Sequence, residues 1–426
     1  MNKRFFCGLG TLIVFLSLSA QTSLNSPYSQ HGLGILADQS QGASRGMNGA
    51  SLGLRQSNII NTINPASYAC VDSLTMIFDM GVSGQISHFK ETVNGVTKSM
   101  NAKNASIDYA VASFRLRRNV GMALGLLPFS NIGYKYSAST YLDKTNGSLT
   151  ETYSGSGGLH EAFVGVGWQV SKALSIGANI GYLWGELNKS VSTSSTTSIQ
   201  TLSRSYYAMV NSYKLDFGLQ WQKELSKNDM LTIGATVGIG HKLGADPVCS
   251  VTNVSNQDAK SDTINNGISI PMSYGLGFSW THGPNLIVDA DFVMQNWSDV
   301  DFPGIDADGM YTLQSGITKN RYQVNVGADY VPDPVSRNFI KRVHYRLGGG
   351  YATPYYNING KNGPKEFSLS AGFGIPLQNA YNNRSILNVS AQWARMSAPG
   401  MITENIFRVS VGLTFNERWF AKWKIN

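Results

Sequence analysis

Residues able to do acid–base or nucleophilic chemistry are scattered along this 426-residue sequence instead of being gathered in motifs. The acids Asp289 and Asp291 share a face of an expected strand, but carboxylates at that spacing are more often solvated than paired as in a glycosidase. Six histidines stand singly, without the nucleophile motif that a hydrolytic triad needs: His31, His88, His160, His241, His282 and His344. We therefore expect no catalytic residues and no enzyme activity.

Cysteine usage predicts neither a disulfide framework nor a metal site. Cys7 lies in the expected export signal, and Cys70 and Cys249 are far apart in unlike contexts. A structural zinc site needs four clustered ligands, which this pattern does not supply. No metal and no cofactor is expected.

Four basic residues indicate anion binding instead. Lys214, Arg321, Arg346 and Arg408 fall on the polar, inward face of expected strands. A guanidinium fork suits a carboxylate, so we expect one or two of these residues to receive the acidic head of a ligand. The alternative is that they pair with inward acids and solvate the interior.

The elements that position these residues are indicated by hydrophobic alternation with a period of two. From Leu174 to Trp184 the even positions are apolar, or aromatic, and the odd positions are mostly Ser, Gly or Asn, which is typical of a strand with one apolar face. Fourteen such segments are expected, near residues 74–90, 104–116, 119–137, 160–170, 174–188, 205–223, 229–242, 268–281, 285–297, 319–331, 343–356, 365–376, 385–396 and 405–415.

Short turns alternate with long polar connections at 138–159, 189–204, 243–267 and 298–318. Only 14% of residues are charged, too few for sheets that face water. We predict an all-β fold, a 14-stranded antiparallel transmembrane β-barrel over 74–415, in preference to a soluble sandwich or propeller. Aromatic girdles are expected from residues at strand ends, including Trp168, Trp184, Trp221, Trp280 and Trp297.

Residues 1–20 have the pattern of a cleaved signal peptide. Lys3 and Arg4 precede a short apolar run that ends at Ala20, so export to the outer membrane is expected. An uncleaved anchor is the alternative, which the shortness of the run disfavours. Cleavage would lower the net charge from +8 to +6, and no basic cluster indicates nucleic-acid binding.

The segments that flank the barrel are expected to have roles of their own. Residues 21–73 do not alternate, but they contain apolar anchors that a disordered tail would lack, so a plug inside the barrel is expected. Residues 416–426 mix Trp and Phe with Arg and Lys, which predicts a periplasmic interfacial tail or, alternatively, a docking surface. The strand that ends at Phe415 resembles the signal read by the barrel-assembly machinery during insertion.

Several motifs together resemble the FadL-type outer-membrane transporters of long-chain fatty acids and other hydrophobic compounds, in the style of Bacteroidota members. They occur in the family's order, with the family's strand count, across most of the mature chain. The motifs are GLG (32–34), SRGMNGASLGL (44–54), INPAS (63–67), GMALGLLPFSNIGYKY (121–136), IPMSYGLGFSW (270–280), VMQNWSDV (293–300) and RYQVNVGADY (321–330).

The resemblance implies an N-terminal hatch, with Asn64, Pro65 and Ala66 in its motif, and a lateral opening at a kink in the third strand. Pro128, Phe129 and Gly133 lie where that kink is expected. Proline cannot donate to a β-ladder, so a central strand must break or bulge at Pro128. A harmless bulge near a strand end is the alternative.

Three hypotheses follow for the function. The first is passive uptake of a hydrophobic small molecule, such as a long-chain fatty acid, through the plugged lumen and the lateral opening. The second is a non-transporting subunit or shuttle of an outer-membrane secretion or assembly complex. The third, a lipid-modifying enzyme, lacks a catalytic motif. In each case the protein contacts outer-membrane lipids, and the sequence does not name a ligand.

Overall fold

The computed structural model describes residues 24–73, 75–93, 95–142, 147–195, 202–253, 259–306, 308–377 and 385–418. The expected signal peptide and residues 419–426 of the expected tail lie outside the described residues. The last strand runs to Arg418, so the tail's first three residues continue the strand beyond the expected end at Phe415.

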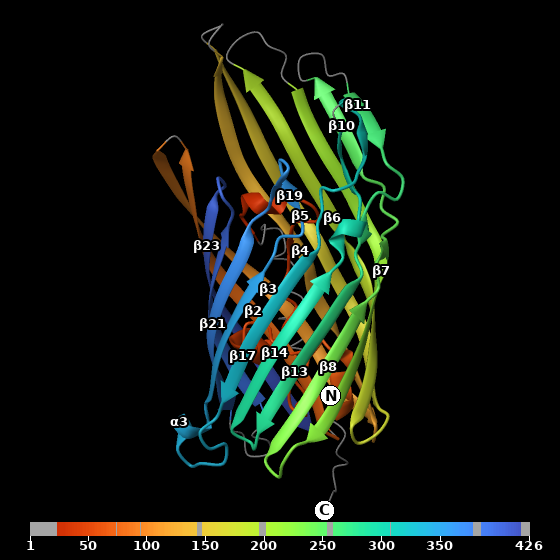
Figure 1. Cartoon of the computed structure of the whole chain (residues 1–426), viewed down its shortest axis with the longest axis vertical. Coiled ribbons are helices and arrows are strands. Elements are labelled where there is room, and N and C mark those ends of the chain that lie inside the picture. Colours follow the sequence, from red (N-terminus) through yellow and green to blue (C-terminus); the bar gives the residue numbers. More distant parts are fainter. Residues whose placement is uncertain are drawn as a thin grey trace, which may run out of the picture.

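Fourteen strands form a closed antiparallel barrel, which confirms the predicted fold class (Figure 1). Each pairs with its neighbours along the chain, and the last strand pairs with the first to close the ring. The strands are β2 (Thr75–Val93), β3 (Val96–Arg117), β4 (Val120–Leu142), β5 (Gly147–Gln169), β6 (Leu174–Ser195), β7 (Leu202–Glu224), β8 (Asp229–Gly238), β13 (Ser273–His282), β14 (Leu286–Gln295), β17 (Arg321–Tyr330), β18 (His344–Ala352), β21 (Lys365–Leu377), β22 (Ser385–Ser397) and β23 (Thr403–Arg418).

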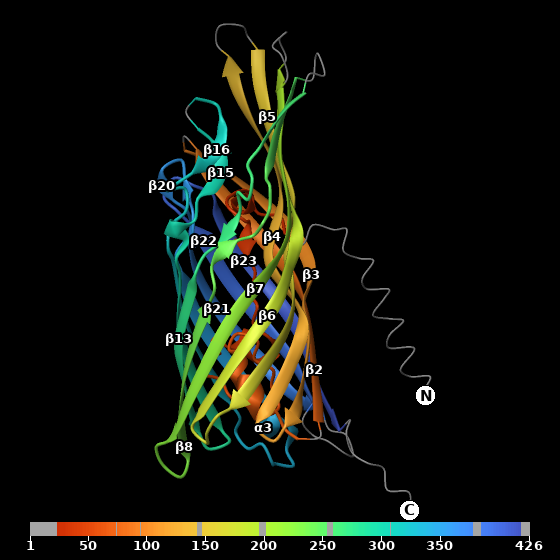
Figure 2. The same cartoon turned by 90° about the vertical axis from the view of Figure 1, so that its right-hand side faces the viewer.

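The prediction of long loops at 138–159 and 189–204 was wrong, because most of the described residues in both regions lie in strands. Strands β4 and β5 extend through the region 138–159, and β6 and β7 extend through most of 189–204, so these hairpins rise above the rest of the wall (Figure 2). Their upper halves carry cross-strand hydroxyl pairs, such as Ser139 with Thr150 at 2.9 Å. Because both faces there are polar, the sequence shows no alternation to reveal the strand.

The predicted strands over 229–242 and 268–281 are each interrupted. β8 ends at Gly238 and β13 begins at Ser273, and above them the short strands β9 (His241–Lys242) and β12 (Ser269–Ile270) pair with each other. Pro271 separates β12 from β13, where it cannot donate to a ladder.

Small elements lie at the end of the barrel that carries the long connections. The hairpin of β10 and β11 extends the sheet beside β7, and two further hairpins and a 3₁₀ turn belong to the connections at the same end. These elements are β10 (Val248–Asn253), β11 (Ala259–Thr263), η3 (Trp297–Asp299), β15 (Phe302–Ile305), β16 (Tyr311–Gln314), β19 (Asn357–Ile358) and β20 (Lys361–Asn362). We call this the long-loop end and the opposite one the short-turn end.

The outer face of the wall is apolar. Leu276, Phe278 and Phe292 are each about half exposed, as are similar residues on the other strands, and together they form the surface of a protein that contacts lipid. Trp168 and Trp221 lie on this face, as predicted. Trp297 does not: it is only 1% exposed and packs on Tyr355 inside the barrel, with ring centroids 4.5 Å apart.

The N-terminal residues 24–73 lie within the ring of strands, as the red ribbon shows in both views (Figures 1 and 2). They form η1 (Pro27–Gln30), β1 (Ile35–Leu36), α2 (Gly42–Gly46) and η2 (Pro65–Cys70), joined by irregular backbone. Among the described residues, no helix has the length and hydropathy needed to cross a bilayer. We call residues 24–73 the lumen segment.

Inward glycines make room for the lumen segment. A Cβ atom added to Gly234 of β8 would overlap the carbonyl oxygen of Leu52, and one added to Gly121 of β4 would overlap that of Tyr68. Side chains on the strands would push this backbone away, so the lumen segment lies directly on the glycine backbone of the wall. Polar neighbours complete the contact, as when the Gln220 amide donates to the Leu52 oxygen at 3.2 Å.

We predict that Gly234→Ala loosens the lumen segment. Overpacking of this kind costs about 1–3 kcal/mol, because the Leu52 backbone must move to accept the methyl group. Gly84→Ala is the matched control, since a Cβ atom there meets only one atom, 4.0 Å away. The temperature at which the folded band disappears on a gel should fall for Gly234→Ala alone; an equal fall for both variants would contradict the prediction.

Candidate functional site

The wall of the barrel parts between β3 and β4. The two strands pair from the turn at Arg117 and Val120 up to Ala110 and Leu126. Beyond that pair, β3 continues to Val96 alongside β2, whereas β4 continues to Leu142 alongside β5. We call this parting the β3–β4 gap.

Pro128 lies just beyond the last β3–β4 pair and gives the gap a local cause. Its nitrogen has no hydrogen to donate. The register with β5 shifts between Pro128 and Ser130, so Phe129 is bulged. The break or bulge predicted at Pro128 is confirmed, while the role of Pro128, Phe129 and Gly133 in a lateral opening remains a prediction.

The start of the lumen segment fills the β3–β4 gap. β1 pairs with β4 in antiparallel fashion, with Leu36 opposite Ser130, and the Ala37 N–H donates to the Phe129 oxygen at 3.0 Å. Higher up, the Ser26 N–H donates to the Gly133 oxygen at 2.7 Å. Toward the other side, the Asn25 amide donates to the side chain of Asn104 on β3 at 2.9 Å.

A buried ion pair anchors the lumen segment beside the gap. Arg45 of α2 reaches Asp108 of β3 at 2.7 Å, with their side chains 7% and 10% exposed. Asp108 is the bulged residue at which the β2–β3 register shifts, next to the end of the β3–β4 ladder. The Ser26 hydroxyl adds a second link, donating to Glu404 of β23 at 2.5 Å.

A cavity of about 220 Å³ lies at the long-loop end, between the lumen segment and the upper parts of β4, β6 and β7. Gln30, His31 and Gly32 line it on one side. Its apolar and aromatic lining includes Tyr134, Leu187, Tyr206, Ile268 and Phe302. Burial lowers the pKa of His31 to about 4, so the imidazole is neutral at pH 7 and stacks on Tyr356.

Lys189 is the cationic group in the lining of this cavity. Its Nζ donates to the Gly32 oxygen at 2.7 Å and lies 5.6 Å from the centre of the Phe302 ring. Its ladder neighbours are Gly155 and Tyr206, above the apolar band of the wall. Within the described part of the chain no carboxylate pairs with it, and burial lowers the pKa of Lys189 to about 8.

The four predicted anion-binding residues lie at separate places in the lumen. Lys214 pairs with Asp216 and, at 3.4 Å, with Glu161. Arg346 pairs with Asp329 at 2.9 Å and also donates to Asn388. These two cations already have protein partners, as the alternative reading of the sequence expected.

The other two predicted cations donate hydrogen bonds to glutamine side chains. Arg321 donates to Gln323 at 2.8 Å, and Arg408 donates to Gln85 and Gln392 at 3.0–3.3 Å. The structure does not bring the four cations into one pocket, and their role in ligand binding remains a prediction.

The hatch motif ties the lumen segment together. The Asn64 side chain accepts from the Ala66 N–H at 3.2 Å and so caps η2, while Pro65 occupies the first helical position, where no N–H is needed. The side-chain nitrogen of Asn64 donates to the backbone oxygens of Leu52 and of Leu219 in β7. Asn64 therefore joins two parts of the segment to the wall.

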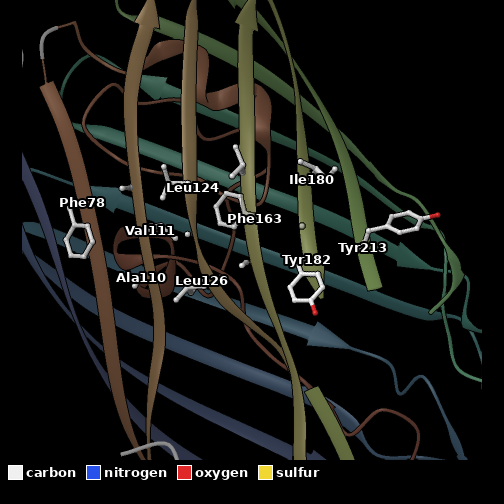
Figure 3. Close-up of a pocket in the computed structure, with 14 residues that line it drawn as sticks. Phe78, Ala110, Val111, Leu124, Leu126, Phe163, Ile180, Tyr182 and Tyr213 are labelled. Carbon is white, nitrogen blue, oxygen red and sulfur yellow. The ribbon is translucent and has the colours of Figure 1, made fainter. Parts of the chain in front are cut away.

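A hollow of about 720 Å³ marks the outer face where the β3–β4 ladder ends (Figure 3). Ala110 and Leu126, the last ladder pair, lie in it. Further round the wall it is lined by Val164, Ile180, Tyr182 and Tyr213. Its walls are almost wholly apolar, so it suits a hydrocarbon chain and not a polar solute.

Sequence reasoning missed Lys189 and Arg45. The predicted strand ended at residue 188, so Lys189 was assigned to a loop and not to the lining of a pocket. Arg45 lay in a motif without periodicity, and its partner Asp108 is 63 positions away.

A family model described as BamG matches residues 1–426. No curated protein matches the chain. The sequence's resemblance to Bacteroidota members remains a prediction.

Several solved structures have a similar fold. The Pseudomonas putida toluene transporter TodX is 15% identical, with a TM-score of 0.59 over 90% of this chain and 100% of its own. The Ralstonia pickettii toluene transporter TbuX is 12% identical, with a TM-score of 0.58 over 88% and 98%. A Pseudomonas aeruginosa FadL homologue is 12% identical, with a TM-score of 0.58 over 90% and 98%. At these identities the likeness establishes the fold.

We predict that Arg45→Met destabilises the protein by about 3–5 kcal/mol, because it leaves Asp108 buried without its cation. The double variant Arg45→Met/Asp108→Leu should recover much of this loss, since neither charge then remains. Urea unfolding in detergent, followed by tryptophan fluorescence, measures both. If the single and double variants unfold alike, the ion pair does not anchor the segment.

Proposed function

Because this chain belongs to the BamG family and folds as a barrel whose wall parts beside an apolar cavity, we propose that it is an outer-membrane channel for hydrophobic compounds. Such compounds enter at the long-loop end and leave sideways through the β3–β4 gap. The observation that carries this proposal is that non-covalently held residues of the lumen segment, and not a strand of the wall, fill the gap.

The cavity and the gap are joined by one short stretch of chain. Gln30, His31 and Gly32 line the cavity, and β1 begins only three residues after Gly32. A ligand that pushes against residues 30–32 therefore pulls on the residues that close the gap. The apolar hollow outside the last ladder pair then receives the ligand at the level of the lipid chains.

Opening the gap costs little compared with breaking the barrel. Residues 25–34 stay anchored through side-chain hydrogen bonds, such as those of Ser26 with Glu404 and Tyr28 with Ile402, and through the buried Leu33. Only the two-residue β1 ladder and the hydrogen bond from the Ala37 N–H to the Phe129 oxygen must break. Each hydrogen bond contributes about 0.5–1.5 kcal/mol net, so ligand binding of ordinary strength can offset their loss. The ladders between wall strands need not open.

A carboxylate on the ligand would account for Lys189. An unpaired, partly buried ammonium attracts an anion, and the apolar lining around it suits a hydrocarbon body. Long-chain fatty acids are the compound class proposed on this basis.

The family's name, BamG, hints at barrel assembly. It supports a second candidate function, that of a barrel subunit in an outer-membrane assembly complex. The closed state of the gap favours it, since a subunit that never conducts needs no opening, and Arg45 with Asp108 holds the lumen segment in place. The two candidates differ in whether β1 must leave the gap.

We predict that a Leu36→Cys/Ser130→Cys disulfide stops uptake of labelled oleate and that a reductant restores it. The two residues are directly opposed, within reach of a disulfide once both are cysteine. Ser250→Cys/Ser261→Cys is the matched control, because it locks the exposed β10–β11 hairpin, where the two hydroxyls are 2.8 Å apart.

Uptake by the locked protein equal to that of the control would contradict the lateral route. Depletion of the protein then separates the candidates. If depletion lowers the amounts of other outer-membrane barrels, and expression of the locked variant prevents this fall, the result supports the assembly subunit.

We predict that affinity for a carboxylate probe falls as the pH rises through about 8. The folded-state pKa of Lys189 is lowered, so the ammonium is present below this pH and lost above it. Binding of oleate, measured by fluorescence displacement between pH 6.5 and 9.5, should show this midpoint, whereas Lys189→Met should bind weakly without it. A hydrocarbon probe of the same length is the control and should show no midpoint in either protein.

A further inference from the structure

The connection between β17 and β18 presents apolar side chains to the outside. It spans residues 331–343 at the short-turn end and contains the single-turn helix α3 (Phe339–Arg342). Val335, Phe339 and Ile340 are 89%, 49% and 64% exposed. We call these residues, with Arg337 and Lys341, the α3 surface.

The α3 surface lies on the outside of the wall and not beneath the lumen. The Tyr345 hydroxyl donates to the Ile340 oxygen at 3.1 Å. Tyr345 shares its face of β18 with Leu347, which is 67% exposed on the lipid side, and its ring meets the lipid-facing Phe373 with centroids 5.8 Å apart. The α3 surface is therefore continuous with the apolar band, and in Figure 1 α3 lies beside the lower ends of β17 and β21.

Two exposed cations complete this surface. Arg337 and Lys341 are exposed, and within the described ranges neither forms a salt bridge. The nearby carboxylate of Asp333 is used locally, since it accepts from the Val335 N–H at 3.1 Å. The positive charge thus remains available to an outside partner.

We propose that the α3 surface binds anionic phospholipids of the periplasmic leaflet. Short turns of outer-membrane barrels face the periplasm, which places α3 at the inner lipid interface. Phe339 and Ile340 would lie among the upper acyl carbons, while Arg337 and Lys341 meet phosphate oxygens. Lipid is favoured over a protein partner because the surface is an unbroken extension of the band that lipid already covers.

The test uses a bimane label in full-length protein reconstituted with brominated lipids. Ile340→Cys carries the label in a Cys7→Ser/Cys70→Ser/Cys249→Ser background whose folding is checked on a gel. Met310→Cys, 53% exposed at the long-loop end, is the control. Bromine should quench the label at 340 and leave that at 310 unquenched.

Brominated phosphatidylglycerol diluted into phosphatidylcholine measures the preference for an anionic head group. Each cation near such a surface changes association about fivefold, so Arg337→Gln/Lys341→Gln should bring the preference close to one. Lys172→Gln/Lys227→Gln removes two exposed charges from other turns of the same rim and should leave it unchanged.

Three results would overturn the proposal. Absence of quenching at 340 would mean that the surface faces water. Quenching without a head-group preference would mean that the cations do not bind phosphate. A photo-crosslinker at 340 that captures one discrete polypeptide in intact cells, together with loss of lipid contact there, would assign the surface to a protein.

Discussion

A membrane-spanning wall has no water to satisfy its backbone, so each N–H and C=O within it must find a partner in protein. Most neighbouring strand pairs meet this constraint through ladders that run along the wall, whereas β3 and β4 part at Ala110 and Leu126. The N-terminal residues supply the missing partners to β4 at Ser130, Asn131 and Gly133. The lumen segment is therefore part of the wall as well as its filling.

The same constraint explains the unusual lining of the lumen. Backbone of the segment must come close enough to the strands to exchange hydrogen bonds, and only glycine leaves that space at positions such as Gly121 and Gly234. Where strand side chains are present they are short and polar, or they are long amides such as Gln220 that reach a carbonyl of the segment. Arg45 also attaches the segment to the wall, since it pairs with Asp108, the bulged acid of β3.

Alternation in the sequence was enough to predict the barrel and its fourteen strands, because one face meets lipid and the other does not. It failed where that contrast vanishes, as along the upper ends of β4 to β7, where Ser and Thr occur at both odd and even positions. It also failed for Trp297, whose position at a strand end resembled a girdle residue although the chain turns inward there. Pro128 was found because its chemistry is local, whereas Lys189 and Arg45 acquire meaning only through Gly32 and Asp108, which no periodicity connects to them.

The position of the lumen segment has a consequence for how the molecule assembles. Residues 24–37 are synthesised before the strands of the wall, yet they pair with residues 129–133, and the segment's other end continues into β2, one of the two strands that close the ring. A finished barrel could be threaded only with difficulty, so the segment must already lie across the curling sheet when β2 meets β23. Contacts this distant in sequence make closure slow, and a chain with a damaged N-terminus is expected to accumulate as an open sheet with two unpaired edges.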